Sequence, residues 1–236
     1  MEEINEESYL TGYPNIIPYE CSKKIIEQME KNICKFKIEK KKETIIEQKK
    51  ETKIEQVQGT GFFCKIPFPN RENMLPVFIT NHHLINEDIL NKDDGKIQIK
   101  IKKDNDEKII SIKDRLKYTN EKYDTTIIEI KEKDGIKDFL ELDEGIINHI
   151  INNKNENNEY KDETIYIIQY PEFHLSVSYG ILAEIFELNP YKFNHKCDTR
   201  KGSSGAPILN LNNKIIGIHI GGYKEKIKQN FNAESF

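Results

Sequence analysis

Hydrophobic and polar residues alternate along much of the chain with the period of two that is typical of β-strands. In the first half, this pattern predicts strands at residues 33–38, 59–66, 76–81, 97–102, 108–113 and 125–131. The segments 97–102 and 108–113 flank a short polar stretch, which is the signature of a hairpin. Several short strands at this spacing indicate a β-barrel or a β-sandwich.

A second series of strands follows, at residues 164–171, 176–188, 206–222 and 230–236. Within 206–222, Asn212 and Asn213 separate two apolar runs and predict a compact hairpin turn. The stretch 152–162 between the two series is rich in Asn and Glu and predicts a linker. We therefore expect three parts: an N-terminal extension at 1–30, a first β unit at 31–155 and a second at 156–236.

The extension ends in a helical pattern, with apolar side chains at Ile25, Ile26, Met29 and Ile33 in the sequence SKKIIEQMEKNI. This pattern predicts a short helix before the first strand. The charged stretch 39–57, between the first two strands, is expected to be a solvated extension of their hairpin. A regulatory loop is the alternative for this stretch.

Charge argues against several classes of partner. The chain has 36 Lys and Arg residues against 40 Asp and Glu residues, and the two signs are interspersed. The basic run Lys40–Lys42 is flanked by Glu39 and Glu43. A nucleic-acid or anionic-membrane surface needs a cluster of unopposed cations. We therefore expect neither nucleic acid nor a membrane as a partner, and nothing in the sequence decides the oligomeric state.

Location and metal content are inferred from what the sequence lacks. The first residues show no secretory signal, and no run approaches the ~18 apolar residues of a membrane span. The cysteines are scattered, so we expect reduced, packed thiols in an intracellular, cytoplasmic protein, with Cys34 and Cys64 able to face each other on neighbouring strands. His149, His174 and His195 show no ligand spacing, so no metal or other cofactor is expected.

Three residues at strand ends are candidates for nucleophilic catalysis. His83 ends the apolar strand of FITNHHLI, Asp124 precedes the strand of KYDTTIIEI, and Ser204 lies in the glycine turn DTRKGSSGAP. A serine hydroxyl becomes a useful nucleophile when an imidazole takes its proton. A carboxylate behind the imidazole holds the required tautomer. Gly202, two residues before Ser204, lets backbone N–H groups converge on a developing oxyanion.

These segments, TNHHLI, YDTTIIEI and KGSSGAPILNLNNKIIGIHIGG, resemble the catalytic blocks of trypsin-like serine proteases of chymotrypsin fold. Within that superfamily they are most similar to glutamyl endopeptidases and intracellular trypsin-like peptidase domains. The resemblance runs from about residue 33 to the end. It implies an all-β protein with two six-stranded antiparallel β-barrels, an active site in the cleft between them, and a short N-terminal helical segment.

The same resemblance implies a serine endopeptidase that acts on polypeptides through an acyl-enzyme and without a cofactor. His83 is then the base, Asp124 orients it, Ser204 is the nucleophile, and the N–H groups of Gly202 and Ser204 form the oxyanion hole. Ser203 is expected to have no essential function, because only Ser204 has glycine both two positions before it and directly after it.

Small departures from the family pattern leave the catalytic groups in place. His82 occupies a variable position, Leu84 replaces a usual valine, and Thr125 stands where isoleucine or leucine is common. Since His82 and His83 are adjacent, an exchange of their functions stays open. The trypsin activation sequence is absent, so a zymogen switch of that kind is not expected.

The resemblance also predicts a substrate pocket. In glutamyl endopeptidases and related viral cysteine proteases, residues at the offsets of Thr199 and His219 line the S1 pocket and donate hydrogen bonds to a P1 Glu or Gln. A purely structural His219 is the alternative. Ile220, Gly221 and Gly222 are expected to form the strand edge that pairs with the substrate backbone.

Two other functions remain open at the level of sequence. A pseudoprotease of the same fold would bind peptides without cleaving them. An acyl hydrolase of esterase type would use the same residues on a different substrate.

Overall fold

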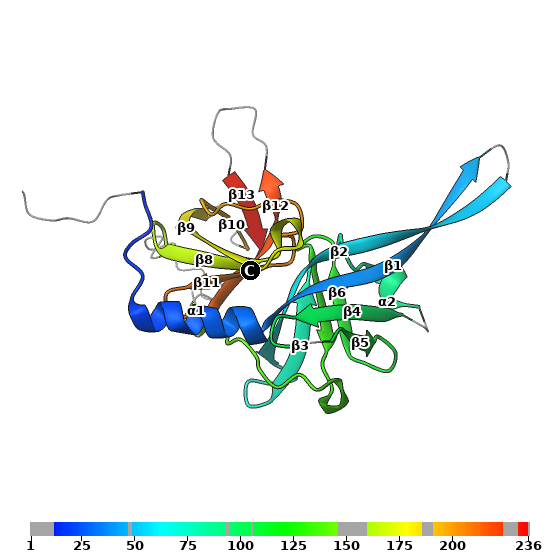
Figure 1. Ribbon diagram of the computed structural model, residues 1–236, viewed down its shortest axis with the longest axis horizontal. Helices are drawn as coiled ribbons and strands as arrows, with labels where there is room; N and C mark the ends of the chain where they lie inside the picture. The colour runs from blue at the N-terminus through cyan, green and yellow to red at the C-terminus, as the bar shows by residue number, and fades with distance from the viewer. Residues whose placement is uncertain are drawn as a thin grey trace, which may run out of the picture.

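The computed structural model describes residues 12–46, 49–92, 95–104, 106–145, 160–185, 191–223 and 231–235. Two curled antiparallel β-sheets lie side by side, and a helix runs beneath the second sheet towards the first (Figure 1). The predicted all-β fold class, with two β units and a short N-terminal helical segment, is confirmed.

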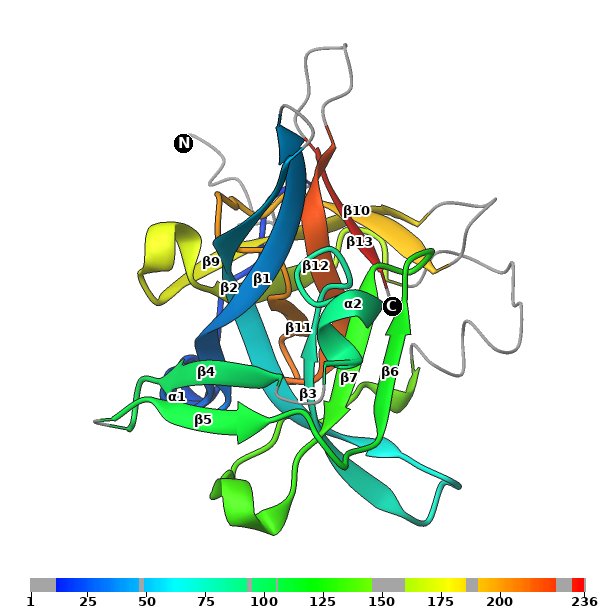
Figure 2. The same ribbon diagram turned by 90° about the vertical axis from the view of Figure 1, so that its right-hand side faces the viewer.

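The first sheet has seven strands in the order β5-β4-β1-β2-β3-β7-β6, where six were expected. Figure 2 shows β4 and β5 at one edge and β6 and β7 at the other. The strands are β1 Ile33–Ile46, β2 Lys49–Pro67, β3 Met74–Thr80, β4 Lys96–Ile101, β5 Lys108–Ser111, β6 Lys117–Asn120 and β7 Thr125–Glu129. The additional strand β6 is short and partly exposed, so it lacks the apolar alternation that reveals β4.

The hairpin of β1 and β2 extends well beyond the sheet (Figure 1). Its register runs from the pair Ile33 and Phe62 to the pair Ile46 and Lys49, whereas β4 pairs only with the stretch from Cys34 to Lys37. The expected hairpin extension at 39–57 is thus confirmed as strand, and its turn at 47–48 lies outside the described residues.

The second sheet closes into a barrel with the order β10-β13-β12-β11-β8-β9. Its strands are β8 Thr164–Gln169, β9 Ser176–Ile185, β10 Lys192–His195, β11 Pro207–Asn210, β12 Ile215–Tyr223 and β13 Phe231–Ser235. The predicted turn between β11 and β12 is present, with Asn213 in the left-handed region at φ 62°. The expected linker at 152–162 lies largely outside the described residues.

Helix α1 spans Tyr19–Lys31, three residues earlier at its start than the pattern predicted. It buries Cys21, Ile25 and Gln28, whereas Ile26 is 58% exposed. Ile33 belongs to β1 instead, because the helix ends before it. The remaining helical segments are single turns: α2 Glu87–Leu90, η1 Glu132–Asp134 and η2 Pro171–Phe173.

Helix α1 is hydrogen-bonded to both sheets. The Gln28 side chain donates to the carbonyl of Asn213 at 2.9 Å and accepts from the Tyr166 hydroxyl at 2.8 Å. At the other end, the N–H of Phe63 donates to the carbonyl of Asn32 at 3.0 Å. The helix therefore connects β2 of the first sheet with the β11–β12 turn of the second.

One apolar core joins the sheets. It combines side chains of α1, the first sheet and the second sheet, including Ile25, Phe62, Val77, Ile79, Tyr166, Ile168, Leu209 and Ile218. All four cysteines are buried and free, and burial raises the pKa of the Cys34 and Cys64 thiols. Cys34 and Cys64, which the sequence allowed to face each other, do not do so, because Cys34 lies opposite Gly61 and packs in a different core.

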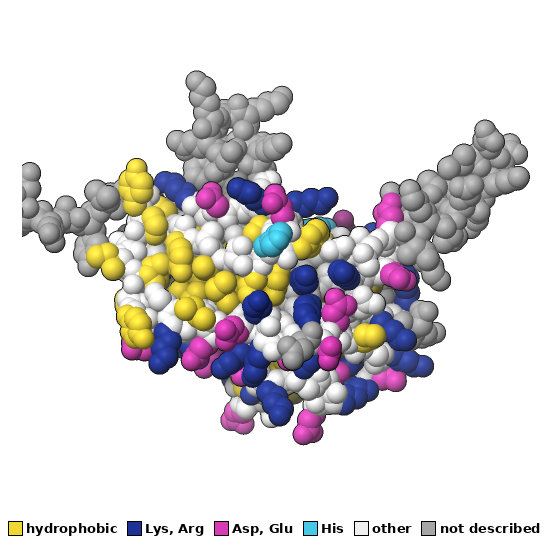
Figure 3. Space-filling model, viewed as in Figure 1, with side chains coloured by type: hydrophobic (Ala, Val, Ile, Leu, Met, Phe, Trp, Pro, Cys, Tyr) yellow, Lys and Arg dark blue, Asp and Glu magenta, His cyan; other side chains and the backbone are white. Residues whose placement is uncertain are grey.

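The surface carries a hydrophobic band over α1 and the second barrel, while cations and anions are interspersed over the first sheet (Figure 3). Within the described ranges, no helix is both long and apolar enough to cross a membrane. The cytoplasmic location stays a prediction.

Replacing Tyr166 by phenylalanine tests the attachment of α1. We expect Tyr166→Phe to lower the free energy of unfolding by about 1–3 kcal/mol, because the buried Oε1 of Gln28 loses its hydroxyl donor. Urea unfolding measures this change. Tyr179→Phe removes a hydroxyl from a 37% exposed ring and should change stability by less than ~0.5 kcal/mol. Equal effects of the two substitutions would contradict the interpretation.

Candidate active site

His83 and Asp124 meet where two neighbouring strands end. Thr80, the last residue of β3, pairs with Thr126 of β7, so the residues after one strand and before the other share an edge. The backbone N–H of His83 donates to Oδ1 of Asp124 at 2.8 Å, and Nδ1 of its ring lies 2.7 Å from Oδ2. An ionised carboxylate only accepts, so Nδ1 carries the proton and Nε2 keeps a lone pair.

The backbone of Asp124 is itself fixed. It lies in the left-handed region at φ 47°, a conformation in which aspartate is enriched. Its N–H donates to the carbonyl of Glu121 at 3.1 Å, and its carbonyl accepts from the Asn81 side chain at 3.0 Å. Backbone and side-chain hydrogen bonds thus fix the turn that carries the Asp124 carboxylate.

The histidine doublet is resolved by its contacts. Nδ1 of His82 lies 2.9 Å from Oγ1 of Thr119, and the ring is largely buried. The ring of His83 bonds Asp124 and is 45% exposed. Nδ1 of His82 also lies 3.7 Å from Oε2 of Glu87, which is beyond hydrogen-bond distance. His83 is therefore the ring that is hydrogen-bonded to a carboxylate at the surface.

The turn that carries Ser204 leaves two N–H groups available. Gly202 and Gly205 lie at φ 99° and 84°, which favours glycine. The N–H groups of Ser203, Gly205 and Ala206 are bonded to backbone carbonyls, whereas those of Gly202 and Ser204 have no partner in the described part of the chain. These are the two donors that the sequence predicts for an oxyanion hole.

The two serines of the turn differ in their environment. Ser203 is buried, and its hydroxyl accepts the N–H of Arg200 at 3.1 Å, so it stabilises the turn rather than lacking a function. Ser204 is half-buried, and its hydroxyl bonds no group among the described residues. The structure thus joins His83 to Asp124 but shows no hydrogen bond from Ser204 to His83.

The serine and histidine turns nevertheless meet at Gly59 of β2. A Cβ at Gly59 would lie 2.5 Å from Cδ1 of Leu84, which follows His83, and 3.3 Å from the carbonyl oxygen of Ser204. Gly59 therefore lies against both turns. The absence of a side chain there lets them approach each other.

A second histidine pair lies inside the barrel, next to the serine turn. The N–H of Cys197 donates to Nδ1 of His195 at 3.0 Å, and Nε2 of His195 lies 3.4 Å from Nδ1 of His219. With Nδ1 as an acceptor, neutral His195 carries its proton on Nε2 and can donate to His219. Neutral His219 then carries its own proton on Nε2.

Both rings of this pair are neutral at pH 7. Burial and the neighbouring His219 hold the pKa of His195 well below its ordinary value. Burial, together with the smaller effect of the charge of His83, lowers the pKa of His219 to about 3. The effect of His83 on this pKa indicates that the two rings lie near each other.

The other predicted pocket residues belong to the segment before the serine turn and to the end of β12. Thr199 is half-buried in the segment between β10 and the serine turn. β11 begins at Pro207, opposite Ile218, so β12 continues past it through Ile220, Gly221 and Gly222. A register shift against β13 falls between His219 and Gly221. The predicted substrate edge therefore begins beside the serine turn, where the N–H of His219 donates to the carbonyl of Ala206 at 2.8 Å.

Sequence reasoning missed Thr60 and assigned no function to His195. Thr60 bonds the serine turn from the other sheet. His195 reaches His219 because β10 and β12 both flank β13, with His195 opposite Asn232 and His219 opposite Glu234. No local spacing signals either contact, since both depend on strands that are distant in sequence.

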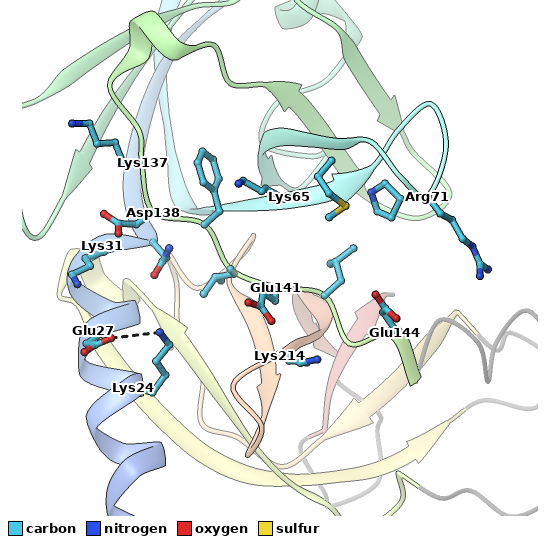
Figure 4. A pocket seen from close by; sticks show the side chains of 16 residues that line it. Lys24, Glu27, Lys31, Lys65, Arg71, Lys137, Asp138, Glu141, Glu144 and Lys214 are labelled. Carbon is cyan, nitrogen blue, oxygen red and sulfur yellow. Dashed lines mark hydrogen bonds and ion pairs between the residues drawn. The ribbon is translucent and has the colours of Figure 1, made fainter.

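A surface cavity of about 680 Å³ lies elsewhere, between α1, the β2–β3 hairpin and the connector at 137–144 (Figure 4). Its charged lining residues are Lys24, Glu27, Lys31, Lys65, Arg71, Lys137, Asp138, Glu141, Glu144 and Lys214. It contains none of the predicted site residues, and its charges are mixed.

Residues 59–218 match the family described as trypsin-like peptidase domain. Since this match covers more than half of the chain, the protein belongs to the trypsin-like peptidase family, a family of serine proteases. No curated protein matches the chain.

Solved structures show the same fold. A serine-to-alanine variant of the HtrA-type protease AlgW with a decapeptide is similar at a TM-score of 0.61 and 12% identity, over 90% of this chain and 62% of that one. The chain thus spans less than two thirds of AlgW. The inactive form of the Rv3671c protease from M. tuberculosis is similar at a TM-score of 0.55 and 12% identity, over 96% and 93% of the two chains. The chymotrypsin-type fold is confirmed, and the closeness to glutamyl endopeptidases stays a prediction.

The buried histidine pair predicts a loss of stability in acid. The unfolded chain protonates these rings near their ordinary pKa of 6.5, whereas folded His219 does so near 3. The free energy of unfolding is therefore unaffected by the protonation of these rings above pH 6.5. It decreases as the pH falls from 6.5 towards 3, by about 1.4 kcal/mol per pH unit for each ring. Urea unfolding at pH 7, 6 and 5 measures this slope.

The matched variants are His195→Gln and His174→Gln. We expect the first to reduce the pH slope, because one buried titrating ring is removed. His174 is exposed, so its replacement should leave the slope unchanged. An unchanged slope in His195→Gln would show that burial of the pair does not control acid stability.

Proposed function

We propose that the protein is a serine endopeptidase in which Ser204, His83 and Asp124 cleave peptide bonds. The observation that carries the proposal is the double hydrogen bond from His83 to Asp124, which fixes the ring orientation and leaves Nε2 able to accept a proton. Membership of the trypsin-like peptidase family supports it. The AlgW structures, which contain a decapeptide, support a polypeptide as the substrate class.

The reaction follows from these groups. The Ser204 hydroxyl oxygen attacks the scissile carbonyl carbon while its proton passes to Nε2 of His83. Asp124 stabilises the resulting imidazolium, and the N–H groups of Gly202 and Ser204 bind the oxyanion. His83 then protonates the leaving amine, which gives an acyl-enzyme. Water, deprotonated by His83, attacks the acyl group and releases the acid, so no step requires a cofactor.

We further propose a P1 preference for Gln and Glu. The relay from Cys197 through His195 gives His219 an Nε2–H donor, and the Thr199 hydroxyl offers a second. A neutral ring donates to an amide oxygen without leaving a charge uncompensated. Gln is therefore expected to be preferred over Glu. Ile220–Gly222 would pair with the substrate backbone.

A peptide-binding module without activity is the second candidate. The observation that favours it is the Ser204 hydroxyl, which has no bond to His83 in the described part of the chain. Catalytic hydrogen bonds are often longer before substrate binds, so this geometry is compatible with both functions. Covalent reactivity of Ser204 distinguishes them.

Labelling with a fluorophosphonate probe tests the nucleophile. We expect the wild-type protein to be labelled and Ser204→Ala to lose labelling, together with at least about 10⁴-fold of any peptidase activity. Ser203→Ala removes only the bond to Arg200 and should retain labelling. Absence of labelling in the folded wild-type protein would reject the enzyme in favour of the binding module.

A peptide library that varies P1 tests the pocket. We expect kcat/KM for P1 Gln or Glu to exceed that for P1 Leu by at least about 100-fold, because an apolar side chain accepts no hydrogen bond from Thr199 or His219. Thr199→Val and His219→Ala should lower this ratio, whereas His174→Ala should preserve it. Since the ratio is measured within each variant, a reduced folded fraction cancels. A library without enrichment for Gln or Glu, or a ratio insensitive to His219→Ala, would refute the pocket.

A further inference from the structure

Thr60 is a buried residue of β2, in the first sheet, yet its hydrogen bonds are made largely with the second barrel. Its N–H donates to the carbonyl of Ser204 at 3.0 Å. Its hydroxyl donates to the carbonyl of Gly202 at 2.7 Å and accepts the N–H of Tyr170 at 3.0 Å. The single hydroxyl proton and one lone pair are thus both used. One side chain thereby holds two loops of the opposite barrel.

The first of these loops contains the two N–H groups of the proposed oxyanion hole. The carbonyl of Lys201 accepts the N–H of Glu172 at 2.8 Å. In a trans peptide the N–H points away from the carbonyl, so the N–H of Gly202 faces away from the η2 turn. The carbonyl of Gly202 is held by Thr60. Both peptide groups that flank Gly202 are therefore fixed by neighbours.

The second loop, η2 with its flanking residues, supports the first and is itself strained. Glu172 and Phe173 lie in the left-handed region at φ 50° and 67°. Such residues persist when the surroundings hold them. The bond from Tyr170 to Thr60 anchors the entry to this loop, and the bond from Glu172 to Lys201 ties the loop to the serine turn. Thr60 therefore controls the serine turn both directly and through η2.

The fit leaves no room for adjustment. A Cβ at Gly202 would lie 2.6 Å from the carbonyl oxygen of Tyr170. A Cβ at Gly205 would overlap the carbonyl oxygen of Thr60 and the hydroxyl of Thr80, which itself bonds that carbonyl at 2.9 Å. The turn thus packs directly against β2, where the bonds from Thr80 to Thr60 and from Tyr170 to Thr60 are buried.

We propose that Thr60 is a positioning residue, whose hydroxyl holds the N–H groups of Gly202 and Ser204 in the orientation that binds the oxyanion. This inference rests on the proposed function. Valine has the shape of threonine but makes neither bond, so Thr60→Val leaves the carbonyl of Gly202 and the N–H of Tyr170 buried without partners. The turn then relaxes to satisfy them, and the oxyanion donors move with it.

Three variants test the proposal in the full chain. We expect Thr60→Val to lower kcat for peptide cleavage by about 10²–10³-fold, the usual cost of one misplaced oxyanion donor, with KM changed by only a few fold. Thr60→Ser keeps the hydroxyl and should retain kcat within about tenfold. Thr164, at the start of β8, has another buried hydroxyl, which accepts a hydrogen bond from the N–H of Asn15. Thr164→Val removes this hydroxyl and should leave kcat unchanged.

A binding measurement separates positioning from general support of the fold. A peptidyl trifluoromethyl ketone forms a tetrahedral adduct whose oxygen occupies the oxyanion hole, whereas the amine product, released from the leaving-group side of the scissile bond, has no oxygen at that position. Thr60→Val should weaken binding of the ketone by about the factor by which it lowers kcat. It should change the affinity for the amine product by only a few fold. Equal loss of both affinities, or unchanged kcat, would overturn the proposal.

Folding and activity controls complete the test. If Thr60→Val does not fold, Thr60→Ala gives the same comparison, since it also lacks the hydroxyl. If Thr60→Val and Thr60→Ala both fail to fold while Thr60→Ser folds, the hydroxyl is required for folding. That result would overturn the proposal. If the wild-type protein is not labelled by a fluorophosphonate, the proposed function fails. Labelled wild type with fully active Thr60→Val refutes only the positioning by Thr60.

Discussion

The close approach of the serine turn to β2 is the constraint on which the site depends. At Gly205 the turn touches the backbone of Thr60 so closely that a Cβ would overlap it, and at Gly59 both Leu84 and Ser204 press against the same strand. The candidate nucleophile belongs to one sheet and the candidate base to the other. Their distance is therefore set by how the sheets pack, which the shared apolar core and helix α1 determine.

The His83–Asp124 pair and the His195–His219 pair differ in their electrostatic environment. The His83 ring is partly exposed, and its Nδ1–H is hydrogen-bonded to the carboxylate of Asp124. His219 is buried beside His195 and stays neutral, because burial and the nearby His83 both oppose its protonation. The two rings therefore lie in different environments, one partly exposed beside a carboxylate and the other buried and neutral. Burial in the fold, rather than position in the sequence, keeps the His219 ring neutral.

Much of this arrangement was predictable from the sequence, because its signals are local. Apolar alternation located most of the strands, and the ends of two buried strands drew attention to His83 and Asp124. Short strands such as β6 and β10 offered too few residues for a pattern. Thr60 and His195 could not be assigned, since their bonds join segments that only the folded topology brings together. The register of β1 against β2 could not be predicted either. It places Cys34 opposite Gly61, so Cys34 and Cys64 do not face each other.

The attachment of helix α1 also has a consequence for the order in which the chain acquires its structure. Gln28 bonds Asn213, which is 185 residues further along, and Thr60 bonds Gly202 across a separation of 142. Contacts between such distant segments form late in folding, after long loops have closed. On the ribosome, the first sheet is complete before the serine turn is synthesised. The candidate site is therefore incomplete until the serine turn has emerged and packed against β2.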